Sequence, residues 1–489
     1  MKPFNYKKLT IGVLLVAIAL RLALTLMHTI SGDACWHFSA SKFMADNLRI
    51  PFDESLGRSK FEPFWPSPLF HLIAAFFYEF LGEFGLKLVP FMFGSLSLML
   101  AYLIFKKFLD DKQTFYATLF MSFLPIGIDY SILGYPESTV MFFVILSIYF
   151  AANQRFFLSG ISAGLVILAK FTGVFVIPTL LFLAYRHSKN TKERIKNLVY
   201  VTIVPLIVSM PWFIRNWLLL GNPIWPFLNF IFNGLQQESY SNFGLGNLAR
   251  PDTYIITYLG FFGVPDGHYR AFFFFDVPYI KVLISIFVIA TLIFVFPLFF
   301  GFSKDKRYGF IYIFLASFAL LLLLFELNVR PAVSRIVLPA IFGLAFIYGI
   351  GMDKLLDKFK KSRKLLLIFV IIMVSGFVAA EVIKFKLASS TWRDYKGDFD
   401  WIKANTQKEA IILNGGQCIH FRTDRKIIFP EEDINSNNYD YVWINQDFAL
   451  EPQSIMTKEE LAVLSKKNLE LVYDNKKTNT KIYKNVRKK

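Results

Sequence analysis

The sequence is poor in charge. Asp, Glu, Lys and Arg together make up 18% of its 489 residues, whereas an ordinary soluble domain contains about 25%. Apolar residues make up 55%, and apolar runs near the spanning length of about 20 residues recur along most of the chain. A soluble globular protein is therefore excluded, and we predict a polytopic membrane protein. Because lipid offers no hydrogen-bond partner to backbone groups and the runs are continuous, the spans should be helices and not barrel strands.

Cysteine is equally scarce, and several familiar motifs are absent. The two cysteines, Cys35 and Cys418, lie in no CxxC or Cys/His pattern. This spacing predicts neither a structural zinc site nor a disulfide framework. The chain also lacks GxxxxGKS/T, GxSxG, HExxH and a Gly-rich dinucleotide fingerprint. ATP-driven transport and cytoplasmic nucleotide-sugar chemistry therefore have no support in the sequence.

The net charge of +17 bears on orientation. Much of it lies in short loops between apolar runs, and such loops stay on the cytoplasmic side and meet anionic lipid. We therefore expect no nucleic-acid partner. The first span has a basic lead-in without a small-residue cleavage site, so it should remain as a signal anchor. Counting Lys and Arg predicts about eleven transmembrane helices, with the amino end cytoplasmic and the carboxyl end outside. The expected spans are 9–29, 86–106, 112–130, 137–153, 156–169, 171–186, 198–219, 279–301, 308–327, 332–351 and 364–384.

One apolar stretch does not fit a crossing. Residues 68–81 open with Pro-Ser-Pro and are shorter than a span, which indicates a re-entrant or interfacial helix. Counting them as a crossing would place the basic pair Lys106 and Lys107 outside. The sequence thus predicts a transmembrane domain over 1–384, with outer loops at about 30–85 and 221–279.

The tail, 385–489, has a different composition. Short β-like runs alternate there with helical patterns at 399–405 and 457–467, which predicts a small soluble α/β domain on the extracytoplasmic side. The β-like runs are 410–413, 426–429, 441–444, 469–473 and 481–483. In the first outer loop, an amphipathic helix is expected with one face made of Ala34, Phe38, Ser41, Ala45 and Leu48.

The first acidic residue after the first span is Asp33, in Ser31-Gly32-Asp33-Ala34. At the lipid–water boundary, its carboxylate can reach both a lipid headgroup and a water-borne acceptor, and it can act as a general base. A helix starting near Ser31 would put His37 on the same face, one turn on. The alternative is that Asp33 only caps this helix. The spacing does not decide between the two, and His37 has a headgroup or packing contact as its alternative.

A second acid, Glu137, lies at the outer end of the third and fourth spans, with Asp129 as a weaker candidate. Two acids that converge from separate outer loops can position an acceptor or hold a divalent cation through their oxygens. The alternative is a hydrated loop carboxylate. A divalent cation is therefore possible, and no other cofactor is indicated.

Several cations fall where a leaving phosphate would need countercharge. Arg21 lies within the first span, where a charge is costly and marks a candidate functional site. Lys170 interrupts an apolar stretch, and Arg215 and Arg335 lie at outer ends of spans. Snorkelling to the interface is the alternative for each. Arginine suits a bidentate grip on phosphate, and the clustering of cations on the outer side favours a binding role.

The order of these pieces resembles the GT-C superfamily of polyprenyl-phosphate-sugar-dependent glycosyltransferases, which includes protein O-mannosyltransferases and lipid A aminoarabinose transferases. The resemblance is loose but covers the full length. Besides Gly32-Asp33-Ala34, it rests on Trp65-Pro66-Ser67-Pro68-Leu69-Phe70-His71, Tyr135-Pro136-Glu137, the stretch 164–173 around Lys170, Pro211-Trp212-Phe213-Ile214-Arg215-Asn216 with Gly221-Asn222-Pro223, and Arg335-Ile336-Val337-Leu338-Pro339.

The resemblance implies that Asp33 is the catalytic base, that Glu137 helps to build the site, and that Lys170 and Arg335 lie near the lipid phosphate. It also implies a sugar donor on a polyisoprenyl phosphate and inversion at the anomeric carbon, with a protein, lipid or glycan acceptor. His37, His71, Arg21 and Arg215 complete the candidate substrate-binding set. Ala34 stands where the family often has a second acid, and this weakens the case for metal binding at Asp33.

Two alternatives remain. Residues 392–397, Trp-Arg-Asp-Tyr-Lys-Gly, are similar to the Trp-Trp-Asp-Tyr-Gly motif of oligosaccharyltransferases but lack its second Trp; we interpret them as the lead-in to the first helix of the tail. A transporter or flippase of lipid-linked sugars would instead place ionisable residues near the bilayer midplane between repeated halves. Here the candidates gather at the outer surface and no repeat is visible. The sequence therefore favours an enzyme in a prokaryotic cell membrane.

Overall fold

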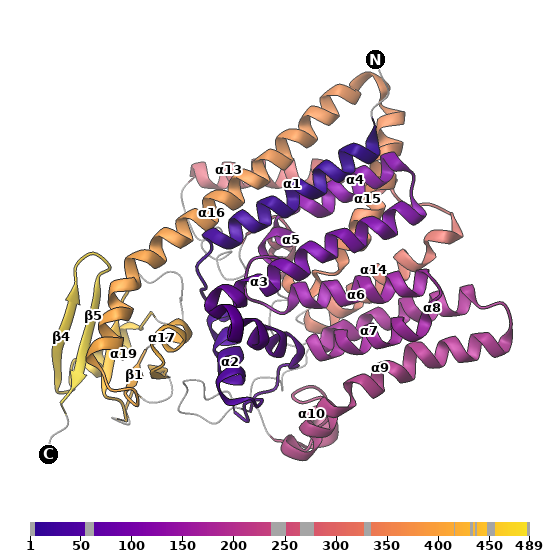
Figure 1. Cartoon of the computed structure of the whole chain (residues 1–489). Coiled ribbons are helices and arrows are strands. Elements are labelled where there is room, and N and C mark those ends of the chain that lie inside the picture. Colours follow the sequence, from indigo (N-terminus) through magenta and orange to yellow (C-terminus); the bar gives the residue numbers. More distant parts are fainter. Residues whose placement is uncertain are drawn as a thin grey trace.

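The computed structural model describes residues 5–53, 63–235, 251–264, 278–326, 334–414, 416–430, 434–435, 438–446 and 455–486. Up to residue 405 the described chain is mostly helical, and its helices gather in one bundle (Figure 1). They are α1 (Tyr6–Met27), α2 (Asp33–Asn47), α3 (Leu69–Phe108), α4 (Asp111–Phe123), α5 (Pro125–Asp129), α6 (Glu137–Ala152), α7 (Phe156–Ala169), α8 (Ile177–His187), α9 (Thr191–Leu220), α10 (Asn229–Phe232), α11 (Pro251–Phe261), α13 (Pro278–Val295), α14 (Gly309–Glu326), α15 (Ala340–Lys358) and α16 (Arg363–Asn405).

Within the described residues, five helical segments are long and apolar enough to cross a membrane: Tyr6–Met27, Leu69–Phe108, Thr191–Leu220, Lys306–Leu324 and Lys360–Asn405. Shorter apolar helices, α6, α7 and α8 among them, pack between these segments. The predicted class, a helical polytopic membrane protein, is confirmed. The number of crossings, eleven, stays a prediction.

The stretch predicted as the first outer loop contains two helices where the sequence predicts them. Helix α2 buries Ala34, Phe38, Ser41 and Ala45 as expected. The prediction was wrong for Leu48, which is 92% exposed and ends α2 in a left-handed conformation. The expected interfacial helix 68–81 is the first part of α3, and a non-helical Gly82 (φ 57°, ψ −144°) separates it from the span that follows. Glycine is the residue that adopts this conformation without strain. Of the second outer loop, residues 236–250 and 265–277 lie outside the described residues.

The tail forms a five-stranded sheet in the order β2-β1-β3-β5-β4. Strand β1 pairs in parallel with β2 and β3, while β5 pairs antiparallel with β3 and β4. The elements are β1 (Ile411–Leu413), α17 (Gly416–Thr423), β2 (Lys426–Ile428), β3 (Tyr441–Ile444), α19 (Lys458–Leu464), β4 (Leu469–Asn475) and β5 (Thr480–Asn485). All five predicted strand runs are present, so the predicted α/β character of the tail is confirmed.

Helix α16 joins the bundle to this sheet without a break (Figure 1). It includes both the predicted span 364–384 and the predicted tail helix 399–405. At its far end, the buried carboxylate of Asp398 accepts hydrogen bonds from the hairpin β4–β5, whose donors are Tyr473, Asn475, Thr478 and Thr480 at 2.5–2.8 Å. The sheet is therefore anchored to the last helix of the bundle.

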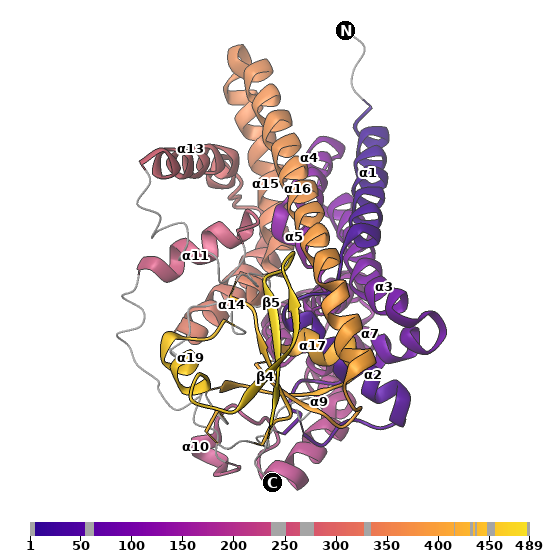
Figure 2. The same ribbon diagram turned by 90° about the vertical axis from the view of Figure 1, so that its left-hand side faces the viewer.

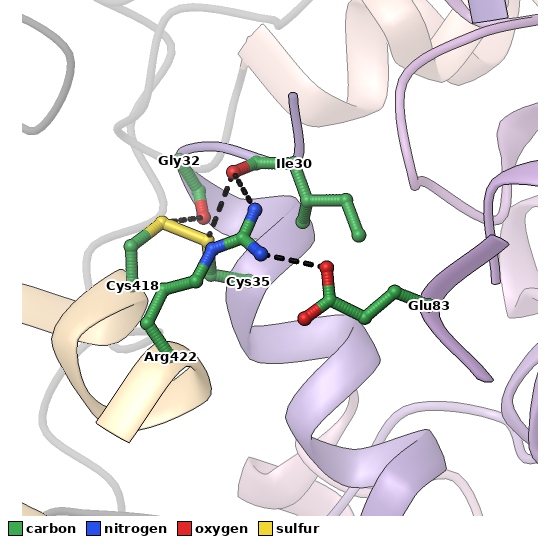
Figure 3. The surroundings of a disulfide bond; sticks show 6 residues. All are labelled: Ile30, Gly32, Cys35, Glu83, Cys418 and Arg422. Carbon is green, nitrogen blue, oxygen red and sulfur yellow. Dashed lines mark hydrogen bonds and ion pairs between the residues drawn. A yellow bond between two sulfur atoms is a disulfide. The ribbon is translucent and has the colours of Figure 1, made fainter. Parts of the chain in front are cut away.

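A disulfide joins Cys35, in the first turn of α2, to Cys418 in α17, across 383 residues of sequence (Figure 3). The spacing of the two cysteines indicates no disulfide framework, yet the fold joins them. Spacing along the chain carries no information about a pair brought together by the fold. Helix α17 contacts both α2 and α16, so it lies between the first outer helix and the last span (Figures 1 and 2).

Candidate active site

Asp33 stands at the start of a helix. The preceding residue, Gly32, has φ 59° and ψ −144°, which only glycine adopts readily, and it turns the chain from α1 into α2. A carboxylate in the first turn faces the positive end of the helix dipole. The Asp33 side chain is 51% exposed, and its Oδ2 accepts a hydrogen bond from Nη1 of Arg335 at 3.1 Å. Asp33 is thus held in place and remains accessible from water.

Glu137 begins α6, and its side chain is only 4% exposed. Nζ of Lys170 donates a hydrogen bond to its Oε1 at 2.6 Å, and Nε of Arg335 lies 3.8 Å from the same oxygen. One guanidinium therefore bridges both carboxylates. We call Asp33, Glu137, Lys170 and Arg335 the charge cluster.

The two cations of the charge cluster lie outside the α-helices. Lys170 follows α7 with an extended backbone (φ −167°, ψ 136°), and Arg335 lies in the short helix η6 (Ser334–Val337) over the ring of Tyr135, 5.0 Å from its centroid. Burial lowers the pKa of Arg335, but the nearby carboxylates of Glu137 and Asp33 raise it further, so it stands well above its ordinary value. The guanidinium stays charged, and the cluster carries two positive and two negative groups.

A histidine pair lies beside the charge cluster. Nδ1 of His37 is 2.9 Å from Nε2 of His71, so the N–H of one imidazole donates a hydrogen bond to the ring nitrogen of the other. Burial, and after it the charges of His71, Arg335 and Lys170, lower the pKa of His37 well below its ordinary value. A neutral pair with a shared hydrogen bond has fixed orientation. The rings that contact the pair belong to Trp36, Phe64, Phe70 and Tyr135.

The other two candidate cations, Arg21 and Arg215, lie outside the charge cluster and hydrogen-bond to chain segments around it. Arg21 is buried in α1 and donates to the Ser131 hydroxyl at 3.2 Å and to the Ser122 carbonyl at 2.9 Å. It thereby fixes the segment that leads to Glu137. Arg215 in α9 donates to backbone carbonyls of the first outer loop, at Phe64 and Pro51 (3.1 and 3.0 Å). The hydrogen bonds of both arginines join segments of the chain, and a direct contact with substrate stays a prediction for them.

Sequence reasoning missed one ionic group. Nζ of Lys384, in α16, lies 2.5 Å from Oδ1 of Asp129 and 2.6 Å from Oε2 of the buried Glu381. Asp129, the weaker candidate for the second acid, is therefore engaged here. Two charged residues three positions apart inside an apolar span are a signal that could have found this group, because such charges are rare in membranes and are usually paired.

The charge cluster does not fit a divalent-cation site in this arrangement, because a guanidinium and an ammonium already lie against its two carboxylates. In the part of the chain that the structure describes, no three His, Cys, Asp or Glu side chains are grouped to hold a metal ion.

Residues 63–214 match the family described as dolichyl-phosphate-mannose-protein mannosyltransferase. That segment contains Glu137, Lys170 and His71 of the site. None of the curated proteins matches the sequence.

Solved structures match along nearly the whole chain. ArnT from Cupriavidus metallidurans, bound to undecaprenyl phosphate, superposes with a TM-score of 0.63 at 13% identity, covering 97% of this chain and 98% of that one. The Archaeoglobus fulgidus oligosaccharyltransferase in its apo form gives 0.55 at 13% identity, over 98% and 74%. AglB from Archaeoglobus fulgidus, with an inhibitory peptide and a dolichol-phosphate, gives 0.53 at 12% identity, over 99% and 75%. The expected resemblance to the GT-C superfamily is confirmed, and at these identities the structures establish the fold.

Proposed function

We propose that this chain is an integral membrane glycosyltransferase. It moves a sugar from a polyisoprenyl phosphate to an acceptor at the outer face of the membrane, with inversion and with Asp33 as general base. The observation that carries the proposal is the charge cluster, in which Arg335 bridges Asp33 and Glu137 beside Lys170. A half-exposed carboxylate next to two fixed cations provides a base and phosphate countercharge within one site.

The reaction is a single displacement. Asp33 takes the proton of the acceptor group while the acceptor atom bonds to the anomeric carbon from the side opposite the phosphate. The bond between that carbon and the phosphate oxygen breaks, and its electron pair leaves with the polyprenyl phosphate. The donor phosphodiester carries one negative charge and the departing monoester carries about two. Lys170 and Arg335 stabilise the charge that develops, and Glu137 holds both cations in position.

The similar proteins supply the donor class. ArnT of the matching structure is bound to undecaprenyl phosphate, and AglB to a dolichol-phosphate together with a peptide. The matched family is named for a dolichyl-phosphate-linked mannose and a protein acceptor. These names support a lipid-linked donor for this chain and make a protein acceptor the first to test, before lipid and glycan acceptors.

The proposed orientation has the amino end in the cytoplasm and the sheet domain outside. The distribution of Lys and Arg supports it. The Cys35–Cys418 disulfide adds independent support, because disulfides persist in oxidising compartments and are rare in the cytoplasm. Since Cys35 lies two residues after Asp33, the same argument supports an outer-side position for the charge cluster.

The test is transfer by the purified full-length protein in lipid nanodiscs. Undecaprenyl-phosphate-linked mannose, glucose and aminoarabinose serve as donors, with a Ser/Thr-containing peptide, lipid A or an oligosaccharide as acceptor. We expect one donor to release undecaprenyl phosphate together with glycosylated acceptor. Asp33→Asn should lower kcat by about a hundredfold or more, the usual range for a lost general base.

The matched control is Asp46→Asn, which removes a carboxylate on the other face of the same helix and should leave kcat unchanged. Transfer that survives Asp33→Asn at the wild-type rate would remove Asp33 as the base. Movement of donors across the bilayer without any release of undecaprenyl phosphate would instead support the transporter alternative.

A further inference from the structure

The back of helix α2 is attached to the sheet domain. Asp33 and His37 lie on one face of α2, whereas Cys35 and Lys42 lie about 140–180° away from them around the helix axis, given 3.6 residues per turn. That second face runs alongside α17. Cys35 is bonded to Cys418, the ring of Phe38 lies 6.5 Å from that of Phe421, and Nζ of Lys42 lies 2.5 Å from Oδ1 of Asp424. The two helices therefore run side by side in the same direction.

Helix α17 also holds the segment that enters α2 (Figure 3). Nη1 of Arg422 donates to Oε2 of Glu83 at 2.6 Å, and its Nη2 donates to the carbonyl of Ile30 at 3.5 Å. Sγ of Cys418 lies 3.8 Å from the carbonyl oxygen of Gly32. The turn that positions Asp33 is thus contacted by two residues of α17, Cys418 and Arg422.

Packing alone does not make this attachment. Beyond the disulfide, a cavity of about 410 Å³ lies between parts of α2 and the sheet domain, and its lining includes Ser39, Phe43 and Asp46 of α2. Gly32, the residue before α2, has no side chain that could cap the amino end of the helix. The start of α2 is held from the sheet domain by the disulfide and by the contact of Phe38 with Phe421, and from the bundle by the hydrogen bond between Arg335 and Asp33 and by the burial of Ala34.

Helix α17 is itself fixed. Directly after it, Arg425 is buried, and its guanidinium donates to the Thr406 hydroxyl at 2.9 Å and to the carbonyls of Lys403 and Thr406 at 3.0 and 2.9 Å. These groups are the last turn and the cap of α16. Helix α17 is therefore anchored to α16, the longest helix of the described chain, and through α17 the same holds for α2.

We propose that Cys35, Cys418 and Arg422 are positioning residues for the transfer reaction. In this proposal α17 holds the first turn of α2 in the position from which Asp33 reaches the acceptor. Reduction of the disulfide frees the first turn of α2 without touching Lys170 or Arg335, which are carried by other segments. The inference rests on the proposed function for its effect on rate, while its effect on the mobility of α2 can be measured without any substrate.

The experiment compares the oxidised and the thiol-reduced full-length protein in nanodiscs, with the donor that supports transfer. The chain contains 2 cysteines, so an effect of reductant on the protein is assignable to this pair. We expect reduction to lower kcat by about ten- to a hundredfold, the loss typical of a misplaced catalytic group, with the KM for the donor within about twofold. Reoxidation should restore kcat.

The variant Cys35→Ser/Cys418→Ser should have the kcat of the reduced wild type and should not respond to reductant. Arg422→Gln should lower kcat in the same direction, and Lys386→Gln on the exposed side of α16 is the control. Amide hydrogen exchange, measured without substrate, should rise at residues 31–37 in the reduced protein and stay unchanged in α6 and α7.

Full kcat in a reduced protein that titrates two free thiols would overturn the proposal. So would unchanged exchange at 31–37, or a reduced protein that unfolds as a whole. If no donor is turned over by the oxidised protein, the proposed function fails, and the exchange measurement still decides whether α17 holds α2.

Discussion

Gly134 brings the loop before Glu137 into direct contact with α2. A Cβ at this position would lie 2.3 Å from ring carbons of Phe38 and 3.0 Å from Cβ of Ala34. Contacts under 3.0 Å cannot persist, and Phe38 is a buried, rigid neighbour. The absence of a side chain at 134 is therefore what allows Asp33 and Glu137 to share Arg335.

We predict that Gly134→Ala pushes the loop away from α2. Overpacking of a well-filled site costs about 1–3 kcal/mol of unfolding free energy, and kcat should fall because the two carboxylates separate. Gly397→Ala is the control, since nothing lies within 4 Å of its Cβ and alanine favours a helix interior by about 0.5–1 kcal/mol. Thermal unfolding and kcat, measured for both variants, check this. Equal behaviour of the two would contradict the close contact.

The individual charged residues of the cluster could be picked from the sequence, but their meeting could not. Asp33 stood out as the first acid after a span, and Lys170 as a cation that interrupts an apolar run. Local patterns place each residue at the outer end of its own helix. Which helices are neighbours depends on packing between segments more than a hundred residues apart, and the Cys35–Cys418 pair was missed for the same reason.

Helix α16 is fastened to the bundle at a point well inside the apolar chain. Lys384 pairs with both Asp129 and Glu381, and Asp129 ends α5, from which the loop to Glu137 departs. Together with Arg425 at its far end, α16 is thereby connected to the segments on both sides of the charge cluster.

We predict that Lys384→Met is strongly destabilising. Removing one member of a buried ionic group leaves uncompensated charge at a cost of about 3 kcal/mol or more. The loss should be partly reversed in Lys384→Met/Glu381→Gln, which removes one of the orphaned carboxylates. The measurement is the thermal unfolding temperature in detergent, with Lys386→Met on the same helix as control. A single variant as stable as this control would show that the group contributes little.

The presence of helices and strands could be predicted from the sequence better than the lengths of the helices. The break at Gly82 and the five strands agree with local signals: a Pro-Ser-Pro start, glycine, and β-branched runs. The continuous α16 was not foreseen, because polarity rises sharply after residue 384 although the helical backbone continues to Asn405. The amino-acid composition of α16 changes where the helix passes from lipid to water, whereas its backbone hydrogen bonds continue across that boundary.

Two of the histidines that the fold holds neutral lie on the two helices that meet behind Asp33, His37 on α2 and His420 on α17. Burial lowers the pKa of His420, on α17, although the carbonyl of Arg425 and the carboxylate of Asp424 oppose the shift. Burial and neighbouring charges lower the pKa of His37, on α2, still further. In the unfolded chain each imidazole regains a pKa of about 6.5.

We therefore predict loss of stability in mild acid. A group whose pKa is depressed on folding contributes its full stability above the unfolded pKa, and this contribution is lost as the pH falls from about 6.5 toward the folded pKa, because the unfolded state binds the proton first. Each histidine contributes at most about 1.4 kcal/mol per pH unit in that window. Thermal unfolding of the oxidised protein between about pH 7.5 and about pH 5 should show the decline. It should be shallower in His37→Gln and in His420→Gln, and shallowest in the double variant. An identical slope in all four proteins would mean that these imidazoles are not held neutral by the fold.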